Sequence, residues 1–374
     1  MLYSPDTVRG EILMPQPVLV INPGSTSTKV AVFEGEKCLF SRTINHSAAE
    51  LAPYENVASQ FDFRCKTIIK ALEDQHFDLK SLAAVMGRGG LLHPIPGGVY
   101  AVNAPMKADL FSAQYGEHAS NLGGLIADEI AGGLGIPAYI ADPVVVDELC
   151  DLARVSGHKL FHRISIFHAL NQKAVAKRYA RENGKKYDEL NLIVAHMGGG
   201  VSVGFHNHGQ VVDVNQTLTG EGPFSPQRSG TLPAGDLVKL CFSGKYSEAQ
   251  VQRMINGEGG LVSFMGTNDM RDVEKLYHEG DPTATLYYRA FIYQVGKAIG
   301  ALAAAAHGKV DAVLLTGGIA YGKDVVDGIR EMCSFIAPVF AYPGEGELEA
   351  LAQACYGALS GEVKVLEYEQ RIGE

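Results

Sequence analysis

Two hydrophobic patterns alternate along the chain. Short apolar runs, either continuous or with a period of two, predict β-strands. These runs lie at 17–23, 29–35, 38–44, 82–89, 100–103, 136–142, 190–197, 201–209, 210–216 and 311–318. Segments whose apolar residues are three and four apart predict helices, at about 55–76, 106–133, 166–183, 235–243, 247–256, 269–278, 283–307, 323–334 and 346–360. Because strands alternate with helices, we expect an α/β fold rather than an all-β sandwich.

The two halves of the chain share a local pattern. Residues 17–44 contain three predicted strands, joined by a turn of small residues and then by the polar turn "EGEK". Residues 190–216 repeat this arrangement, with "MGGG" as the first turn and "NHGQ" as the second. Triples of strands are common, but a repeat of this size suggests duplicated domains that face each other across a cleft. The length of 374 residues agrees with about two domains, whose junction we expect near the helix at 166–183.

Composition and charge limit the classes of partner. The net charge of −10 argues against nucleic acid or an anionic membrane, which need a basic protein face, but it permits a small anionic substrate. Six scattered cysteines without a CxxC pair indicate reduced thiols rather than a disulfide framework or a zinc site. Residues 1–17 lack the apolar core of a signal peptide, and no long apolar stretch predicts a membrane span. We therefore expect a cytoplasmic protein.

The first turn, at 22–27, has the sequence Asn-Pro-Gly-Ser-Thr-Ser. Small residues let backbone N–H groups approach an anion, and the hydroxyls add further donors. The turn is not a Walker A loop, because a strand rather than a helix follows it. For one such turn taken alone, a polar surface hairpin is the slightly favoured explanation. Together with the glycines at 198–200 and 317–318, however, it indicates a cleft that binds a nucleotide.

Charged residues stand beside several glycines and strand ends, where sites usually form. Arg88 and Arg228 are flanked by glycine, and they are either solvated surface charges or clamps for phosphate or carboxylate. Asp142 follows a predicted strand and is compatible with a cap or with a carboxylate that positions a metal. His118 and His168 are compatible with ordinary core histidines, the more frequent role of a lone histidine. From these residues alone we expect a two-domain α/β protein that binds a nucleotide, most simply an enzyme.

The order of the motifs resembles the acetokinase family, within the superfamily of acetate and sugar kinases, actin and heat-shock-chaperone ATPases. The segments that carry the resemblance are "INPGSTSTK", "GRGGLLHPIPGG", "FHALNQ", "AHMGGGVSV", "TLTGEGPFSPQRSG", "GTNDMR" and "LLTGGIA". They occur in order from residue 18 to about 350, and they are specific as a set. "RGG", "HMGGG" and the pair Asn171 and Gln172 depart from the acetate kinase pattern and resemble the butyrate branch of the family.

The resemblance implies an architecture. We expect two actin-like ATPase (ribonuclease H-like) domains, each with a mixed sheet flanked by helices, and ATP in the cleft between them. The N-terminal domain would span 1–175 and the C-terminal domain 176–357, and a tail of about 358–374 would pack back on the first domain. The family also implies a homodimer or a larger homo-oligomer.

The resemblance further implies an activity. We expect a phosphotransferase that converts butanoate and ATP into butanoyl phosphate and ADP by direct in-line transfer, with Mg²⁺. Kinases of acetate, propionate or branched-chain acids are close alternatives, since they differ only in the acyl pocket. A non-transferring ATPase switch of the actin or chaperone kind is an alternative from another class. Such a switch would not need both Arg88 and Arg228 in the cleft.

The resemblance assigns roles to individual residues. The expected catalytic residues are Arg88, Asp142, His168 and Arg228. The expected ATP contacts are Asn22, Ser25, Ser27, Gly198, Gly199, Gly200, Asp269, Arg271, Gly317 and Gly318. The expected Mg²⁺ ligands are Asn22, Asp142 and Glu347, with Glu345 as the alternative to Glu347. The carboxylate substrate is expected to contact Arg88 and His118, and an apolar pocket for butanoate is expected from Leu91, Ile95 and Phe224.

Overall fold

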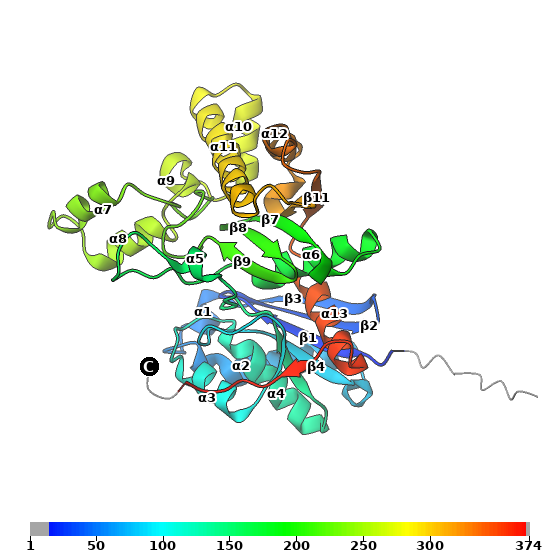
Figure 1. Ribbon diagram of the computed structural model, residues 1–374. Coiled ribbons are helices and arrows are strands. Elements are labelled where there is room, and N and C mark those ends of the chain that lie inside the picture. Colours follow the sequence, from blue (N-terminus) through cyan, green and yellow to red (C-terminus); the bar gives the residue numbers. More distant parts are fainter. Residues whose placement is uncertain (1–14, 372–374) are drawn as a thin grey trace, which may run out of the picture.

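The computed structural model describes residues 15–371, and they form two lobes, each built on its own sheet (Figure 1). The absence of a signal peptide was expected from residues 1–17, which lie almost entirely outside the described residues. No helix within residues 15–371 is long and apolar enough to cross a membrane. The expected α/β class is confirmed, because both sheets are mixed and both are flanked by helices.

The first sheet has seven strands in the order β12-β5-β6-β4-β1-β2-β3. Their bounds are Val18–Pro23 for β1, Ser27–Glu34 for β2, Lys37–Asn45 for β3, Ala84–Arg88 for β4, Val99–Ala101 for β5, Ala138–Ala141 for β6 and Val365–Leu366 for β12. Strand β1 pairs with β2 antiparallel and with β4 parallel. The carboxyl ends of β1 and β4 therefore meet at one edge of the sheet, where sites form in open α/β sheets.

Helices cover both faces of the first sheet. One face carries α2 (Phe61–Glu73), α3 (Ala104–Ser112) and α4 (Asn121–Leu134), and α1 (Ala48–Leu51) follows β3. The other face carries α13 (Glu347–Ser360), which returns from the far end of the chain (Figure 1). Strand β1 is buried on both sides, because alternate side chains point to opposite faces. Leu19 and Ile21 join the core under α2 and α4, whereas Val18 and Val20 pack against α13.

The second sheet has five strands in the order β11-β10-β7-β8-β9. Their bounds are Asn191–Met197 for β7, Val201–Asn207 for β8, Gln210–Val214 for β9, Ala312–Gly317 for β10 and Val339–Pro343 for β11. One face packs on α6 (Ala169–Glu182), and the other packs on α11 (Pro282–Ala305) and α12 (Lys323–Cys333). The remaining helices are α5 (Asp151–Arg154), α7 (Ala234–Cys241), α8 (Glu248–Ile255), α9 (Leu261–Met265) and α10 (Met270–His278). Helices α6 and α13 contact each other where the lobes meet.

One predicted element is wrong. The helix expected over 106–133 is two helices, α3 and α4, separated by residues 113–120. Ala113 caps α3 with a left-handed φ of 52°, and Gly116 has a φ of 119°, so the backbone leaves the helical region twice. The side chain of Asn121 then ties the connection together, because it accepts from the Leu91 N–H and donates to the Gly116 carbonyl.

Candidate active site

The turn between β1 and β2 is held in place by a buried arginine that the sequence analysis did not assign. Arg64, on α2, is 1% exposed. Its Nη1 donates to the carbonyls of Gly24 at 2.8 Å and Ser27 at 3.1 Å, and to the Thr28 hydroxyl at 3.1 Å. Its Nη2 donates to the Ser25 carbonyl at 3.0 Å. The carbonyls of the turn thus face Arg64, which leaves the exposed hydroxyl of Ser25 free for another partner.

Three expected site residues meet beside this turn. Asn22 lies near the end of β1, Arg88 ends β4 and Glu347 begins α13. The Asn22 amide nitrogen donates to Glu347 Oε2 at 2.6 Å, and Arg88 Nη1 donates to Asn22 Oδ1 at 3.2 Å. Arg88 also forms an ion pair with Glu347 at 3.1 Å. Glu345 lies apart from this cluster, because its exposed carboxylate pairs with Lys29 at 3.3 Å.

Asp142 and His168 share a small cavity with Arg88 and Glu347. Asp142 follows β6, is 5% exposed and has a φ of 37°, a left-handed conformation that few residues other than glycine adopt. Its Oδ1 accepts from the Gly98 N–H at 2.8 Å, and its Oδ2 lies 3.5 Å from Lys177 Nζ. The buried carboxylate is therefore aimed by the backbone, as expected for a group that positions a ligand.

His168 stands immediately before α6 and stacks on His196 of β7, with ring centroids 3.8 Å apart. Its Nδ1 lies 2.8 Å from the hydroxyl of Ser202 on β8. Burial, His196 and the arginines Arg228 and Arg88 hold the pKa of His168 well below its usual range. Burial also lowers the pKa of His196 to about 4. Both rings are therefore neutral at physiological pH.

His118 lies at the exposed side of the same region, with Nδ1 2.8 Å from the Ser120 hydroxyl. Its pKa is lowered by desolvation and then by the charges of Arg88 and Arg228. The charges of both arginines also act on His168, and Arg88 lines the same small cavity as His168. Positive charge from two arginines acting on these histidines argues against the ATPase switch, which would not need both arginines in the cleft.

The guanidinium of Arg228 is only partly hydrogen-bonded to the protein, unlike that of Arg64. Its Nε donates to Asn256 Oδ1 at 3.2 Å, whereas its buried Nη1 has no hydrogen-bond partner among residues 15–371. Burial lowers the pKa of the guanidinium, although arginine keeps its charge in proteins. The group lies against Gly200, where a Cβ would come within 1.9 Å of Nη1. A glycine at 200 is therefore required for Arg228 to occupy this position.

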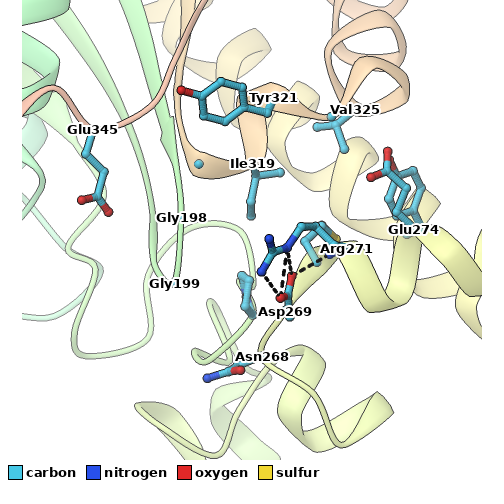
Figure 2. A pocket seen from close by; sticks show the side chains of 15 residues that line it. Gly198, Gly199, Asn268, Asp269, Arg271, Glu274, Ile319, Tyr321, Val325 and Glu345 are labelled. Carbon is cyan, nitrogen blue, oxygen red and sulfur yellow. Dashed lines mark hydrogen bonds and ion pairs between the residues drawn. The ribbon is translucent and has the colours of Figure 1, made fainter.

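A larger cavity of about 730 Å³ opens beside the β7–β8 turn (Figure 2). Gly198 and Gly199 line it from the turn, and Gly318 lines it from the segment after β10. Figure 2 shows Asp269 and Arg271 bonded to each other along the wall formed by α10. The Arg271 side chain lowers the pKa of Asp269 to about 2. The structure thus brings together residues of three of the expected motifs around one cavity.

Gly317, which ends β10, is not among the residues that line this cavity, although its neighbour Gly318 is. It has a φ of 87°, and a Cβ there would lie 2.3 Å from the Met197 carbonyl oxygen. Only glycine lets β10 approach the β7–β8 turn so closely. Gly317 therefore shapes the cavity through the backbone.

The structure does not gather the three expected residues of the acyl pocket into one wall. Ile95 is 5% exposed in the core of the first lobe, and the half-buried Leu91 packs against the same core. Phe224 is 5% exposed in the core of the second lobe, in edge contact with Phe264 and Phe291. Their role as an acyl pocket stays a prediction.

Two groups of oxygen and nitrogen ligands have the chemistry to hold a metal ion. Asn22, Asp142 and Glu347 offer an amide and two carboxylates around the cleft, a hard donor set that suits Mg²⁺. Glu274, His278 and Asp324 also offer ligand atoms within 4.8 Å of one another. In this second group His278 pairs with Asp324 at 3.2 Å, and Glu274 accepts from a tyrosine hydroxyl. The group lies on α10 and α12 of the second lobe.

Several residues behind the site were not assigned from the sequence, although their motifs were recognised. They are His196, Asn171, Gln172 and Ser202. The sequence feature that could have identified them is a polar residue inside a buried strand, as for His196 in β7 and Ser202 in β8. Arg64 carries no comparable signal, because an arginine in an amphipathic helix is usually on the surface.

Comparison with known proteins identifies the family. The chain is 56% identical to butyrate kinase 2 of Clostridium acetobutylicum over 352 residues, and the alignment covers 94% of this chain and 99% of that protein. It is 54% identical to a probable butyrate kinase of Clostridium botulinum, with the same two coverages. Residues 154–335 match the model of the acetokinase family.

Solved structures agree on the fold. Acetate kinase of Porphyromonas gingivalis superposes with a TM-score of 0.76 at 20% identity, over 91% of this chain and 99% of that one. A propionate kinase of Francisella tularensis gives a TM-score of 0.70 at 19% identity, over 91% and 98%. These likenesses confirm the expected actin-like ATPase fold. With its high identity to butyrate kinases along nearly the whole chain, the protein belongs to the acetokinase family.

Proposed function

We propose that this cleft transfers the γ-phosphoryl group of ATP to butanoate in line, giving butanoyl phosphate and ADP. The chain is an ATP-dependent carboxylate kinase, since it belongs to the acetokinase family and its relatives at 53–56% identity are named butyrate kinases. The observation that supports the site assignment is the small cavity that Arg88, Asp142, His168 and Glu347 line together.

The arrangement suits phosphoryl transfer between two anions. Such a reaction depends mostly on positioning and on neutralising charge, and an arginine aimed at the transition state contributes roughly 10³–10⁵ in rate. A carboxylate is already an adequate nucleophile, so no general base is required. Ser202 and His168 are hydrogen-bonded, but Ser202 is 0% exposed and cannot reach a substrate. We therefore assign His168 to contact with the transferring group rather than to activation of a nucleophile.

Each remaining role follows from a position in the cleft. Asn22, Ser25 and Ser27 would contact phosphate from the first lobe, because the turn that contains them is rigid and presents hydroxyls. Gly198, Gly199 and Gly200 would contact it from the second lobe. The nucleoside would lie in the cavity of about 730 Å³, near Gly318 and its chain neighbour Gly317, and along the wall that Asp269 and Arg271 build.

Mg²⁺ is the second proposed cofactor. Asn22, Asp142 and Glu347 would hold it, because their oxygen donors suit the ion and Asp142 is buried and oriented. When bound, the ion would neutralise charge on the phosphate oxygens. Arg88, bonded to Asn22 and Glu347, would orient these ligands and face the incoming carboxylate.

The acid preference is tested by measuring acyl hydroxamate formation with Mg-ATP across acetate, propionate, butyrate, isobutyrate and valerate. We expect the largest kcat/KM with butyrate, because the extra methylenes are worth about 1–3 kcal/mol each in a pocket that fits them. A maximum with acetate would leave the kinase in place and overturn the butyrate assignment. Slow ATP hydrolysis that no acid accelerates would instead favour the ATPase switch.

The assembly and cellular location are further proposals. We propose a homodimer or a larger homo-oligomer, because large apolar side chains are exposed in two segments, with Leu152 at 88% in one and Phe242 at 87% in the other. Light scattering at micromolar concentration checks this. A cytoplasmic location is supported by all six cysteines, which are free thiols. Fractionation of the native host would test it.

We also propose two domains with a boundary near residue 175, inside α6 at the lobe junction. The expected division placed 176–357 in the second domain and 358–374 on the first. Because α13 packs on the first sheet from Glu347 onward, we place the return to the first domain at about 346. Limited proteolysis with mass spectrometry would locate the boundaries.

A further inference from the structure

We infer that a chain of hydrogen-bonded side chains behind His168 fixes this imidazole as the tautomer that carries its proton on Nε2. His168 then faces the transferring group only as a hydrogen-bond donor. The chain consists of Ser202, Gln172, His206 and Tyr187. This inference rests on the proposed function for the meaning of His168, but the tautomer itself is measurable without any reaction.

The orientation of the Gln172 amide is the first step. Its Nε2 lies 3.0 Å from the backbone carbonyl oxygen of Ser202 and 2.7 Å from the Ser202 hydroxyl. A carbonyl oxygen only accepts, so the group that faces it must be the NH₂ group of Gln172. The two hydrogens of that group are then used on the two oxygens of Ser202.

The Ser202 hydroxyl is the second step. It accepts a hydrogen bond from Gln172, and an NH₂ group cannot accept one in return. Among residues 15–371 the hydroxyl has no other partner that could take its single hydrogen, which is therefore donated to His168 Nδ1, 2.8 Å away. A nitrogen that accepts a hydrogen bond carries no proton, so the proton of the neutral ring resides on Nε2.

At the end of the hydrogen-bonded chain that is farthest from His168, the hydrogen bonds are donated in the same direction, toward His168. Gln172 Oε1 accepts from His206 Nε2 at 3.0 Å, and His206 Nδ1 accepts from the Tyr187 hydroxyl at 2.7 Å. Burial keeps the pKa of Tyr187 well above its usual range, and burial together with Lys173 keeps the pKa of His206 well below. Tyr187 therefore stays a donor and His206 stays neutral.

The local sequence of β8 makes room for this chain. Ser202 and His206 point to the same face of the strand, toward α6, with Gly204 between them. A Cβ at 204 would lie 2.7 Å from Gln172 Oε1, so the glycine forms the notch that the amide occupies. Ser202, His206 and Gln172 are each 0% exposed, so bulk water does not reach these side chains.

A second contact fixes the plane of the ring. His196, stacked on His168, has its Nδ1 2.7 Å from Asn171 Oδ1, while the Asn171 amide nitrogen donates to the Glu345 carbonyl at 2.6 Å. His168 is thus held along one edge by Ser202 and across one face by His196. Its remaining edge faces the cavity lined by Arg88, Asp142 and Glu347.

The test is ¹⁵N NMR of the full chain labelled at histidine, with the His168 signals identified by their loss in His168→Asn. We expect a protonated Nε2 and an accepting Nδ1 in the wild type. In Gln172→Glu the carboxylate only accepts, so the Ser202 hydroxyl turns to it and the His168 proton moves to Nδ1. We expect kcat for acyl phosphate to fall roughly 10–100-fold, as for other positioning partners, with little change in KM for ATP.

Gln216→Glu is the matched control, because Gln216 is also a buried glutamine, 3% exposed, whose Oε1 only accepts from the backbone N–H groups of Leu218 and Thr219. It should change neither the His168 tautomer nor kcat. If Gln172→Glu does not fold, Ser202→Ala serves instead, and His168 Nδ1 should lose the signature of an accepted hydrogen bond.

Three results would overturn the inference. They are a proton on Nδ1 in the wild type, a proton that stays on Nε2 in Gln172→Glu, and a changed tautomer in Gln172→Glu with unchanged kcat. Absence of acyl phosphate formation by the wild type would refute the proposed function instead, and the NMR spectra would still decide whether the chain sets the tautomer.

Discussion

The turn at 22–27 and the turn at 198–200 occupy corresponding places in the two lobes, after the first strand of each repeated triple. Each has an arginine packed beside it. Arg64 is 1% exposed, and its guanidinium donates to the turn's carbonyls and to Thr28, while its Nε donates to Gln60. Arg228 has a buried Nη1 without a partner in the described part of the chain.

The difference shows how two buried arginines beside similar turns can have different roles, one structural and one directed at a ligand. A guanidinium whose donors are satisfied by the protein is structural, whereas a buried and unpaired donor needs an explanation such as a ligand. The first turn supplies its own hydroxyls and needs Arg64 only for rigidity. The second turn has no side chains, and Gly200 leaves the space in which Arg228 is held ready for an anion.

The comparison predicts its largest effect for Arg228→Met. Loss of the guanidinium should lower kcat for butanoyl phosphate by roughly 10³–10⁵, because Arg88 and Mg²⁺, at their own positions, do not replace its charge in the transition state. The free energy of unfolding should be unchanged or slightly higher, since an unpaired buried donor is removed. Steady-state kinetics and urea unfolding measure the two quantities. A variant that keeps a tenth of the wild-type kcat would show that Arg228 is not the transition-state arginine.

Arg64→Met should act mainly on stability. The substitution leaves the carbonyls of Gly24, Ser25 and Ser27 without their partner, so we expect the free energy of unfolding to fall by about 3 kcal/mol. Urea unfolding with a constant m-value checks this. Arg42→Met is the control, because Arg42 is half-exposed in a 3.8 Å ion pair and its loss should cost less than about 0.5 kcal/mol. Equal effects of the two substitutions would contradict the structural role of Arg64.

Much of the fold could be predicted from the sequence, because the long elements have strong hydrophobic periods. The expected strands match β1 to β10, and the expected helices match α2, α6, α10, α11, α12 and α13 within a few residues. The break between α3 and α4 was missed because it depends on left-handed backbone at Ala113 and Gly116. Strand β12 has two residues, too few for a period.

Residues of the candidate site could be predicted where they belong to a local sequence motif. Asn22, Arg88 and Glu347 come from motifs far apart in the chain, and the structure brings them within hydrogen-bond distance. The tautomer chain was not predictable, because Gln172 and Ser202 become partners only when α6 packs on β8. The satisfaction of a hydrogen-bond donor is a property of the folded state, so the sequence does not show that the donors of Arg64 are bonded to the turn.

The smallest expected effect tests whether the second turn acts through Arg228. A Cβ on Gly200 would come within 1.9 Å of Arg228 Nη1, so Gly200→Ala should push the guanidinium away. Because φ at Gly200 is not in the left-handed region, the substitution changes space rather than backbone preference. We expect kcat to fall roughly 10–100-fold, less than for Arg228→Met, since a displaced charge still contributes at longer range.

A double-mutant cycle separates this effect from a general disturbance of the turn. If Gly200→Ala acts by displacing the guanidinium, it should cost nothing further in the Arg228→Met background, where no guanidinium remains to be moved. If the two losses multiply instead, Gly200 would serve the phosphate through its own backbone. The two turns would then be alike in presenting the chain itself to the ligand, and Arg228 would be an addition to the second turn rather than the reason for its glycines.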